Sequence, residues 1–178
     1  METISYKRLT KDNFCENSLD NFIRYQEVKE CWRKIAGKYR LVPHAFVEHW
    51  DQEECREQAR LILQETAHSG VAYGAFCDSE VIGFCMLSGG LFGSNSQYMD
   101  LHLLYVSEPF RNRGIGRTLF RLACDAAREA GAKKLYISAH SSRESQAAYR
   151  SFGCIEAVEI NQRLAENEPF DVQMEYVI

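Results

Sequence analysis

One short polar segment combines three arginines with two glycines, the residue types that bind phosphate. Its members are Arg111, Arg113, Gly114, Gly116 and Arg117. The first N–H groups of a helix have no partner inside the helix, and the helix dipole favours an anion beside them. Glycine also lets a ligand approach the backbone closely. If a helix begins at Gly114, the segment predicts a pyrophosphate site.

Two familiar phosphate-binding motifs fit this segment poorly. A dinucleotide-binding GxGxxG motif would place glycine or alanine where the chain has Leu119. A P-loop would end in Gly-Lys-Ser/Thr, whereas this segment ends in Gly116-Arg117-Thr118 and lacks the spacing. The pattern Arg/Gln-x-x-Gly-x-Gly/Ala does match, at Arg111, Gly114 and Gly116. Taken alone, the segment is equally consistent with a plain helix start carrying solvated arginines.

A second segment, Ser145–Cys154, places Tyr149 four residues before Gly153 near the end of a predicted helix. Gly153 is expected to end that helix in a left-handed conformation. Together the two segments resemble the acetyl-CoA-binding signatures of the GNAT superfamily of N-acetyltransferases, over about residues 70–178. The chain departs from the pattern at Cys154, where phenylalanine is common, and at Ser142, where asparagine is common.

The resemblance implies acetyl-CoA as co-substrate, no metal, and direct attack of a primary amine on the thioester. It also implies that Tyr149 acts on the leaving thiolate, although a tyrosine packed between helix and sheet is the alternative. A phenol has a pKa of ~10 and a thiol ~8.5, so Tyr149 is expected to hydrogen-bond the thiolate rather than protonate it early. The expected coenzyme contacts are Leu104, Tyr105, Val106, Arg111, Asn112, Arg113, Gly114, Ile115, Gly116, Arg117, Ser145 and Tyr149.

The acceptor amine must lose a proton before it attacks, because a lysine-like amine has a pKa of ~10.4. Asp100 and His102 are candidates for the base, since residues two apart on a strand share a face. The resemblance puts Asp100 where the histone-acetylating branch carries a glutamate base. An exposed or hydrogen-bonded strand end is the alternative for each residue, and Glu108 and His140 are weaker candidates. The oxyanion donor is expected to be a backbone N–H near Tyr105 and Val106.

The elements that position these residues follow from hydrophobic periodicity and turn residues. The expected strands are 71–77, 81–88, 98–106, 133–139, 154–160 and 171–177, and the expected helices are 114–130 and 142–152. The strand–helix–strand step over 98–139 predicts a parallel pair, and the hairpin over 71–88 predicts antiparallel pairing. The expected fold is α/β (α+β): a mixed, mostly antiparallel sheet flanked by helices, with a parallel strand–helix–strand unit for acetyl-CoA.

The N-terminal third is expected to shape the acceptor side. It predicts a strand over 4–9, a helix over 12–27, a turn at 36–38 joining two short strands, and a helix from the Asp51/Glu54 capping box to about Thr66. We expect a single domain, 1–178, with 1–69 as the variable acceptor-side part and 70–178 as the acetyl-CoA core. Six aromatic residues are candidates for an acceptor pocket or for plain core packing: Phe22, Tyr25, Trp32, Tyr39, Phe46 and Trp50.

The composition of the chain disfavours some classes of binding partner. The 178 residues are 46% hydrophobic and carry a formal net charge of −4, which disfavours nucleic acid. The chain has no apolar run long enough for a membrane span and no signal-peptide pattern at its start. Its seven cysteines are scattered without a CxxC pair, which favours reduced thiols in a cytoplasmic protein over zinc or disulfides.

Three functions remain open at this point. Acetyl transfer to a small-molecule amine ranks first, acetylation of a protein or peptide second, and a non-catalytic coenzyme-A-binding module third. Related proteins are often homodimers, and nothing in this sequence decides the oligomeric state.

Overall fold

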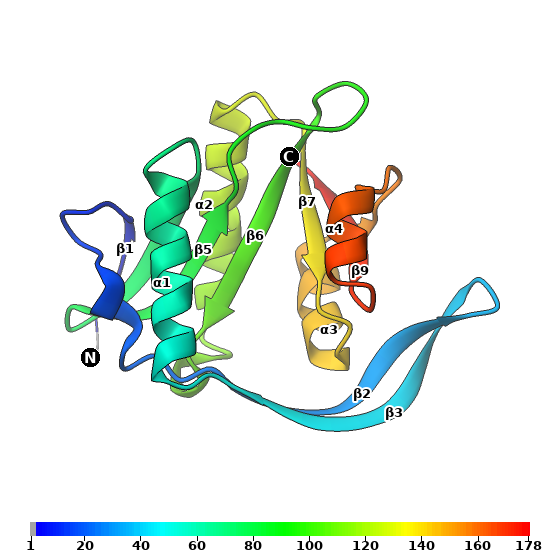
Figure 1. The fold of residues 1–178 in the computed structure, drawn as a ribbon, viewed down its shortest axis with the longest axis horizontal. Coiled ribbons are helices and arrows are strands. Elements are labelled where there is room, and N and C mark those ends of the chain that lie inside the picture. Colours follow the sequence, from blue (N-terminus) through cyan, green and yellow to red (C-terminus); the bar gives the residue numbers. More distant parts are fainter. Residues whose placement is uncertain (1–2) are drawn as a thin grey trace.

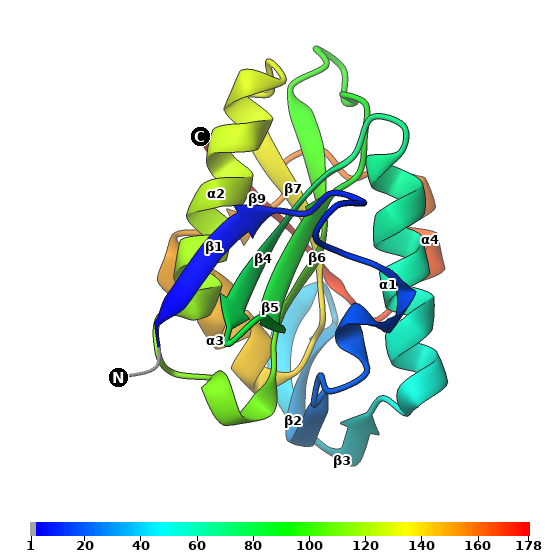
Figure 2. The same ribbon diagram turned by 90° about the vertical axis from the view of Figure 1, so that its left-hand side faces the viewer.

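The computed structural model describes residues 3–178; residues 1–2, the start of the expected domain, lie outside the described residues. Seven strands form one sheet in the order β1-β4-β5-β6-β7-β9-β8, and helices cover both of its faces (Figure 1, Figure 2). Neighbouring strands pair antiparallel except β6 and β7, which pair parallel. The predicted mixed sheet with one parallel pair is confirmed.

The strands of this sheet are β1 (Ile4–Arg8), β4 (Val71–Cys77), β5 (Glu80–Leu87), β6 (Tyr98–Val106), β7 (Lys134–Ala139), β8 (Ile155–Glu156) and β9 (Val172–Val177). A separate hairpin consists of β2 (Tyr25–Ile35) and β3 (Lys38–His49). The helices are α1 (Gln52–Thr66), α2 (Ile115–Glu129), α3 (Arg143–Phe152) and α4 (Gln162–Asn167), with 3₁₀ turns η1 (Glu16–Leu19) and η2 (Glu108–Phe110). Within residues 3–178, no helix is long and apolar enough to cross a bilayer.

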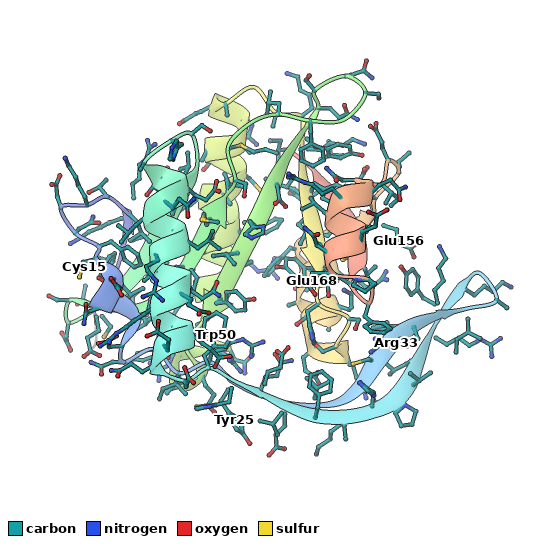
Figure 3. All side chains as sticks on the ribbon, in the orientation of Figure 1. Cys15, Tyr25, Arg33, Trp50, Glu156 and Glu168 are labelled. Atoms are coloured by element: carbon teal, nitrogen blue, oxygen red, sulfur yellow. The ribbon has the colours of Figure 1, made fainter. Side chains whose placement is uncertain are left out.

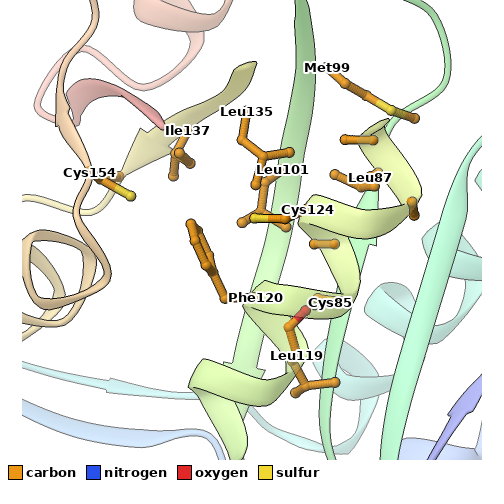
Figure 4. Close-up of a cluster of buried hydrophobic side chains, with 14 of the residues drawn as sticks. Cys85, Leu87, Met99, Leu101, Leu119, Phe120, Cys124, Leu135, Ile137 and Cys154 are labelled. Carbon is orange, nitrogen blue, oxygen red and sulfur yellow. Dashed lines mark hydrogen bonds between the residues drawn. The ribbon is translucent and has the colours of Figure 1, made fainter. Parts of the chain in front are cut away.

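Helix α2 packs on one face of the sheet because its apolar residues recur at helical spacing. Figure 4 shows Leu119, Phe120 and Cys124 of α2 facing the buried strand residues Leu101, Leu135 and Ile137. A Cβ at Gly83 of β5 would lie 3.1 Å from the side chains of both Ile115 and Leu119. The close approach of helix and sheet therefore depends on that glycine, and it fixes the start of α2 beside the end of β6.

Helix α1 covers the opposite face, and α4 lies on the same side as α1 (Figure 2). The predicted capping box is confirmed, since Asp51 Oδ1 accepts the Glu54 N–H at 2.9 Å and Glu54 Oε2 accepts the Asp51 N–H at 2.8 Å. Ala59 and Ile62 of α1 are fully buried against Phe84 of β5 in a second apolar cluster. The site described below thus has a helix layer on each side.

The predicted helix over 12–27 is wrong. Only Glu16–Leu19 is helical, as a 3₁₀ turn, and β2 already begins at Tyr25. Polar side chains bond the local backbone instead: Asn13 Oδ1 accepts the Thr10 N–H at 2.9 Å, and Ser18 Oγ accepts the Cys15 N–H at 2.9 Å. Such bonds compete with a helix, so the segment follows a series of turns.

The hairpin formed by β2 and β3 is much longer than the two short strands expected around the turn at 36–38. Its strands have 11 and 12 residues and pair from Tyr25↔His49 to Ile35↔Lys38. Ala36 and Gly37 both have positive φ, at 49° and 77°, as a tight two-residue hairpin turn requires. The hairpin extends beneath the body of the protein as a curved arm (Figure 1).

The predicted strand over 154–160 is mostly wrong as well. Only Ile155–Glu156 pairs with β9, and a helix that the sequence did not predict, α4, follows. Two side chains, and not a strand partner, bind the backbone that follows β8. Glu175 Oε2 accepts the Val158 N–H at 3.1 Å, and the Tyr136 hydroxyl accepts the Asn161 N–H at 3.0 Å. These partners lie on β9 and β7, far away in sequence.

Candidate active site

The start of α2 has the geometry of an anion site. Gly114 is its N-cap at φ +81°, and Asn112 also has a positive φ of 62°. A Cβ at Gly114 would meet no atom within 4 Å, and one at Gly116 would meet only Val106 Cγ2, at 3.6 Å. Internal packing therefore does not require glycine at position 116. The space that a Cβ would fill fits the pyrophosphate of a coenzyme lying against the backbone.

The three arginines around this turn make different contacts. Arg111 is half-buried and fixes the backbone, because its Nε donates to the Val106 carbonyl at 3.0 Å and its Nη1 to the Tyr25 carbonyl at 2.7 Å. Arg113 lies over the Phe110 ring, 5.1 Å from its centroid, and Arg117 donates to the Ser151 carbonyl at 3.3 Å. All three keep positive charge beside the helix start, while Ile115 contributes only its backbone, since its side chain is buried in the core.

Strands β6 and β7 diverge beside this turn. Their parallel ladder runs only from Tyr98↔Lys134 to Asp100↔Tyr136, although β6 continues to Val106. Ser107 donates its N–H to Ile82 of β5, so the alternation of the antiparallel ladder points the N–H groups of Val106 and Leu104 toward β7. By the same alternation, the Tyr105 N–H points toward β5 and is used in the ladder with that strand. Val106 and Leu104 therefore suit ligand binding through the backbone better than Tyr105 does.

A β-bulge sits in β6 at His102. Met86 pairs with Leu103 and Leu87 with Leu101, so His102 is the extra residue. Asp100 and His102 share the face toward α1 as predicted, and His102 Nδ1 lies 3.1 Å from Asp100 Oδ2. The hydrogen bond and charge of Asp100 raise the pKa of His102 despite partial burial of the ring. A bulge commonly re-aims a side chain next to an active site.

Tyr149 lies on α3, the helix that follows β7. Its ring packs against the α2-side core and contacts Phe152. Burial is the main cause that raises its pKa strongly, with the charges of Asp171 and Asp100 acting in the same direction. The hydroxyl therefore keeps its proton at working pH, and it has no hydrogen-bond partner within the described part of the chain. It is a proton-bearing donor available to a ligand.

Ser142, which stands where related proteins often have asparagine, is fully buried. It caps α3, accepting the Ser145 N–H at 3.2 Å, and donates its hydroxyl to Ser145 Oγ at 2.9 Å. Gly153 closes the helix in the predicted left-handed conformation, at φ +101°. Ser142 and Ser145 thus place Tyr149 by fixing the start of its helix, and the predicted coenzyme contact of Ser145 stays a prediction.

The comparison with protein families decides the identity of this arrangement. The model described as the acetyltransferase (GNAT) family matches residues 29–154, which is most of the chain. This chain belongs to the GNAT family. It is therefore an N-acetyltransferase whose acetyl donor is acetyl-CoA. No curated protein sequence matches the chain.

Solved GNAT structures share the whole fold. Nourseothricin acetyltransferase is 17% identical over 98% of both chains, with a TM-score of 0.72. A putative streptothricin acetyltransferase from Bacillus anthracis str. Ames, in complex with acetyl coenzyme A, is 15% identical over 97% of this chain and 96% of its own, with a TM-score of 0.66. The paia N-acetyltransferase from Thermoplasma acidophilum, in complex with coenzyme A, is 18% identical over 99% of both chains, with a TM-score of 0.61. At these identities the likeness shows the fold.

Polar residues from distant segments meet at the end of β7, among them His140, which the sequence suggested as a weaker candidate for the base. Buried Arg24 forms an ion pair with Glu48 of β3, and Glu48 Oε1 lies 3.1 Å from His140 Nε2 at the end of β7. His140 Nδ1 accepts the Ser142 N–H at 3.2 Å. Asp171, just before β9, lies near the same group. These residues come from four distant segments, so no local pattern could have revealed that they meet.

The six aromatic residues predicted for the acceptor side do not form one pocket. Phe22 is buried against Phe84 on the α1 side, whereas Trp32 and Tyr39 pack against the α2-side core. Tyr25 is exposed. Trp50 lies 4.8 Å from the Tyr105 ring, centroid to centroid, and is the one that borders the β6 wall. Figure 3 shows Trp50 before α1 and Glu168 below α4, with the β2–β3 hairpin passing beneath both.

Proposed function

We propose that this enzyme transfers the acetyl group of acetyl-CoA to a primary amine of a small molecule, by direct attack in a ternary complex. The proposal rests mainly on the divergence of β6 and β7. The start of α2, with the geometry of an anion site, lies beside this divergence, and Tyr149, Asp100 and His102 are the side chains we assign to the chemistry there. This arrangement supports a thioester held between the strands, with a hydroxyl donor on one side and a base on the other.

The donor side is assigned to the start of α2. Backbone N–H groups from Gly114 to Arg117 would hold the pyrophosphate, with Arg113 and Arg117 adding charge. A cavity of about 330 Å³ lies beside α2 and is lined by Arg117, Arg121 and Arg128, the last of which pairs with Asp125. Acetyl-CoA supplies the activated acetyl thioester when bound. The Val106 N–H is assigned to the oxyanion, because it points into the space between β6 and β7.

On the acceptor side, we assign the base to His102, which Asp100 orients through Nδ1. Neutral His102 would take a proton from the amine, and the Tyr149 hydroxyl would donate a hydrogen bond to the departing thiolate. Because burial keeps Tyr149 protonated, it can act as a donor without first being charged. In this proposal His102 accepts the proton from the amine, and Tyr149, on another element, stabilises the negative charge on sulfur.

A small acceptor is favoured by the closed end of the site. The backbone N–H of Trp32 on β2 donates to the Ser141 carbonyl at 2.8 Å, and Cys31 forms an isolated antiparallel β-bridge with Ser142. The chain Arg24–Glu48–His140 adds a second tie between the hairpin and β7. These contacts join the hairpin to the end of β7, which supports a confined acceptor space rather than the open groove that a peptide needs. The similarity to nourseothricin and streptothricin acetyltransferases supports the same substrate class.

Two further assignments belong to this proposal. The seven cysteines are all free, which supports a reducing compartment such as the cytoplasm. Oligomeric state follows from neither the fold nor the site, and a homodimer is a proposal that light scattering would test. Acetylation of a peptide is the competing function, and an acceptor screen that includes peptides separates the two.

Calorimetric titration of acetyl-CoA into the pure protein is the first test. We expect saturable binding that is lost in Arg111→Ala/Gly114→Asp. A screen of amines and peptides with detection of thiol release then identifies the acceptor class. Failure of the intact protein to bind acetyl-CoA at about millimolar concentration would overturn the donor assignment. Turnover of peptides but of no small amine would overturn the acceptor class.

A further inference from the structure

Asp171 ends a one-way chain of hydrogen bonds that starts in the core. The Tyr136 hydroxyl donates to Gln173 Oε1 at 2.8 Å, and Gln173 Nε2 donates to Ser138 Oγ at 2.9 Å. The Ser138 hydroxyl then donates to Asp171 Oδ2 at 3.3 Å. Tyr136 and Gln173 are buried, so the direction of each bond is fixed by its neighbour. The chain orients the Asp171 carboxylate and uses only one of its two oxygens.

No cation pairs with this carboxylate within residues 3–178. The titratable groups that face it are His140 just after β7, Glu168 at the end of α4 and Glu48 of β3. Of these, His140 favours the ionised form of Asp171, as does the hydrogen bond from Ser138. Arg33 contacts Phe170, the residue before Asp171. Its guanidinium stacks over the Phe170 ring, 4.7 Å from the centroid, and donates to Ser141 Oγ. Burial raises the pKa of Asp171 to about 6. Near neutral pH the carboxylate is ionised, and its one hydrogen bond within the described residues comes from Ser138.

Asp171 also faces the reacting side of the site. Its charge contributes to the raised pKa of both Tyr149 on α3 and Tyr105 on β6. The β7–β9 ladder ends at Ala139↔Val172, which puts Asp171 next to the end of β7 and beside the divergence from β6. The carboxylate therefore stands on the wall opposite Asp100 and His102, with Tyr149 exposed to charge from both walls.

We propose that Asp171 binds an ammonium group of the acceptor and thereby selects acceptors that are cationic at working pH. This inference rests on the proposed function, because it assigns a role in acceptor binding at the same site. The free oxygen of the oriented carboxylate accepts an N⁺–H hydrogen bond, while the other oxygen stays with Ser138. Asp171 is a binding and positioning residue, and His102 retains the transfer of the proton.

The test is a comparison of KM with kcat in Asp171→Asn, using cadaverine as the cationic probe and O-benzylhydroxylamine as a probe that is neutral near pH 8. A charge-assisted hydrogen bond predicts a rise of about 10- to 100-fold in the KM for cadaverine, with kcat within about 3-fold. The KM for O-benzylhydroxylamine stays unchanged. Asp171→Glu restores part of the cadaverine affinity.

Glu168→Gln is the matched control, because it removes the same charge from a neighbouring residue that lies outside the hydrogen-bond chain. It changes the KM for cadaverine less than about 3-fold. Ser138→Ala is a second variant for the case that Asp171→Asn fails to fold. It removes the bond that orients the carboxylate and raises the KM for cadaverine but not for the neutral probe.

Several outcomes would overturn the proposal. Equal KM values for cadaverine in wild type and Asp171→Asn would do so, as would an equal loss for both probes. Acetylation of the neutral probe without saturation by cadaverine up to about 10 mM would also reject it, while leaving acetyl transfer intact. If acetyl-CoA binds but neither probe nor any amine of the screen is acetylated, the proposed function fails together with this inference.

Discussion

His102 Nδ1 lies 3.1 Å from Asp100 Oδ2, and the aspartate is the more buried partner, with 9% of its side chain exposed against 40% for the histidine. The carboxylate is thus shielded and fixed while the imidazole is open on its other side. Because the hydrogen bond occupies Nδ1, the Nε2 atom is left to meet an acceptor.

The pH profile of this pair is the first prediction. As a base, His102 must be neutral, and Asp100 raises its pKa, so activity falls as the pH drops through a value above the usual 6.5. Asp100→Asn removes the charge and should shift the acidic limb of kcat/KM to lower pH. His102→Gln should abolish the limb and lower kcat/KM by about 100-fold.

His68→Gln serves as the control for these profiles, because His68 lies exposed beyond α1 with Nδ1 2.9 Å from the Gln64 carbonyl. Its profile should match wild type. An acidic limb that stays in place in both Asp100→Asn and His102→Gln would show that neither residue is the base.

Gly116→Ala should separate ligand binding from folding. A Cβ there meets only Val106 Cγ2 at 3.6 Å, and alanine favours a helix over glycine by up to about 1 kcal/mol. We expect unchanged or slightly higher stability in urea, together with about a 10-fold or greater loss of acetyl-CoA affinity by calorimetry. Gly83→Ala is the contrasting variant, since its Cβ presses on Ile115 and Leu119 at 3.1 Å and should cost about 1–3 kcal/mol. Full acetyl-CoA affinity in Gly116→Ala would reject the backbone site.

Tyr149→Phe should lower kcat by about 10- to 100-fold while leaving acetyl-CoA affinity within about 2-fold. Because burial raises the tyrosine pKa, its hydroxyl stays protonated, and the variant should keep the pH profile of wild type. Single-turnover rates of thiol release provide the measurement. A wild-type rate across the pH range would mean that Tyr149 only packs against Phe152.

How far the sequence predicts this protein depends on the range of the interactions. The start of α2, the cap at Asp51 and the closing Gly153 are local, because glycine φ and capping bonds act within one helical turn. The same local logic failed at residues 12–27, where turn-forming polar side chains competed with an apolar pattern. Local patterns were thus reliable where the capping chemistry and the apolar spacing agreed.

The acceptor side depends on long-range contacts and was largely unpredictable. Glu48, His140 and Asp171 meet only because a long hairpin returns to β7 and because β9 lies beside it. His140 was a weak candidate for the base, and nothing in its own segment or in those of Glu48 and Asp171 indicates that the three meet. Resemblance to a family could nominate residues for the acetyl-CoA side. The grouping of residues on the acceptor side became visible only in the three-dimensional structure.

The ion pair of Arg24 and Glu48 should matter more for stability than a surface pair. Removing Glu48 leaves a guanidinium that is only 8% exposed without its partner, so Glu48→Ala should cost about 3 kcal/mol in urea unfolding. Glu30→Ala, which breaks the exposed pair with Arg143, should cost less than about 1 kcal/mol. His140 and Arg24 lower the pKa of Glu48, so its contribution should be lost as the pH falls through that lowered value. Equal costs for the two variants would contradict a buried pair.

Asp171 should destabilise the fold in its ionised form. Its pKa rises from 3.8 to about 6 in the folded state, so the folded protein binds the proton more tightly and loses stability as the pH rises through this range. Asp171→Asn should therefore gain about 1–2 kcal/mol near pH 8 and little near pH 4. Urea unfolding at both pH values measures this. A loss of stability near pH 8 would indicate that the carboxylate is a structural group.

The bulge at His102 adds one residue to β6 without turning the residues on either side of it. Deleting this one residue would let Leu101 and Leu103 close up into a regular ladder with their present partners Leu87 and Met86, so Met99 and Asp100 would keep their faces and only the side chain at position 102 would be lost. Any other residue at position 102 leaves those faces unchanged as well. We therefore expect divergent relatives to exchange or omit the residue at position 102 while the rest of β6 keeps its register against β5.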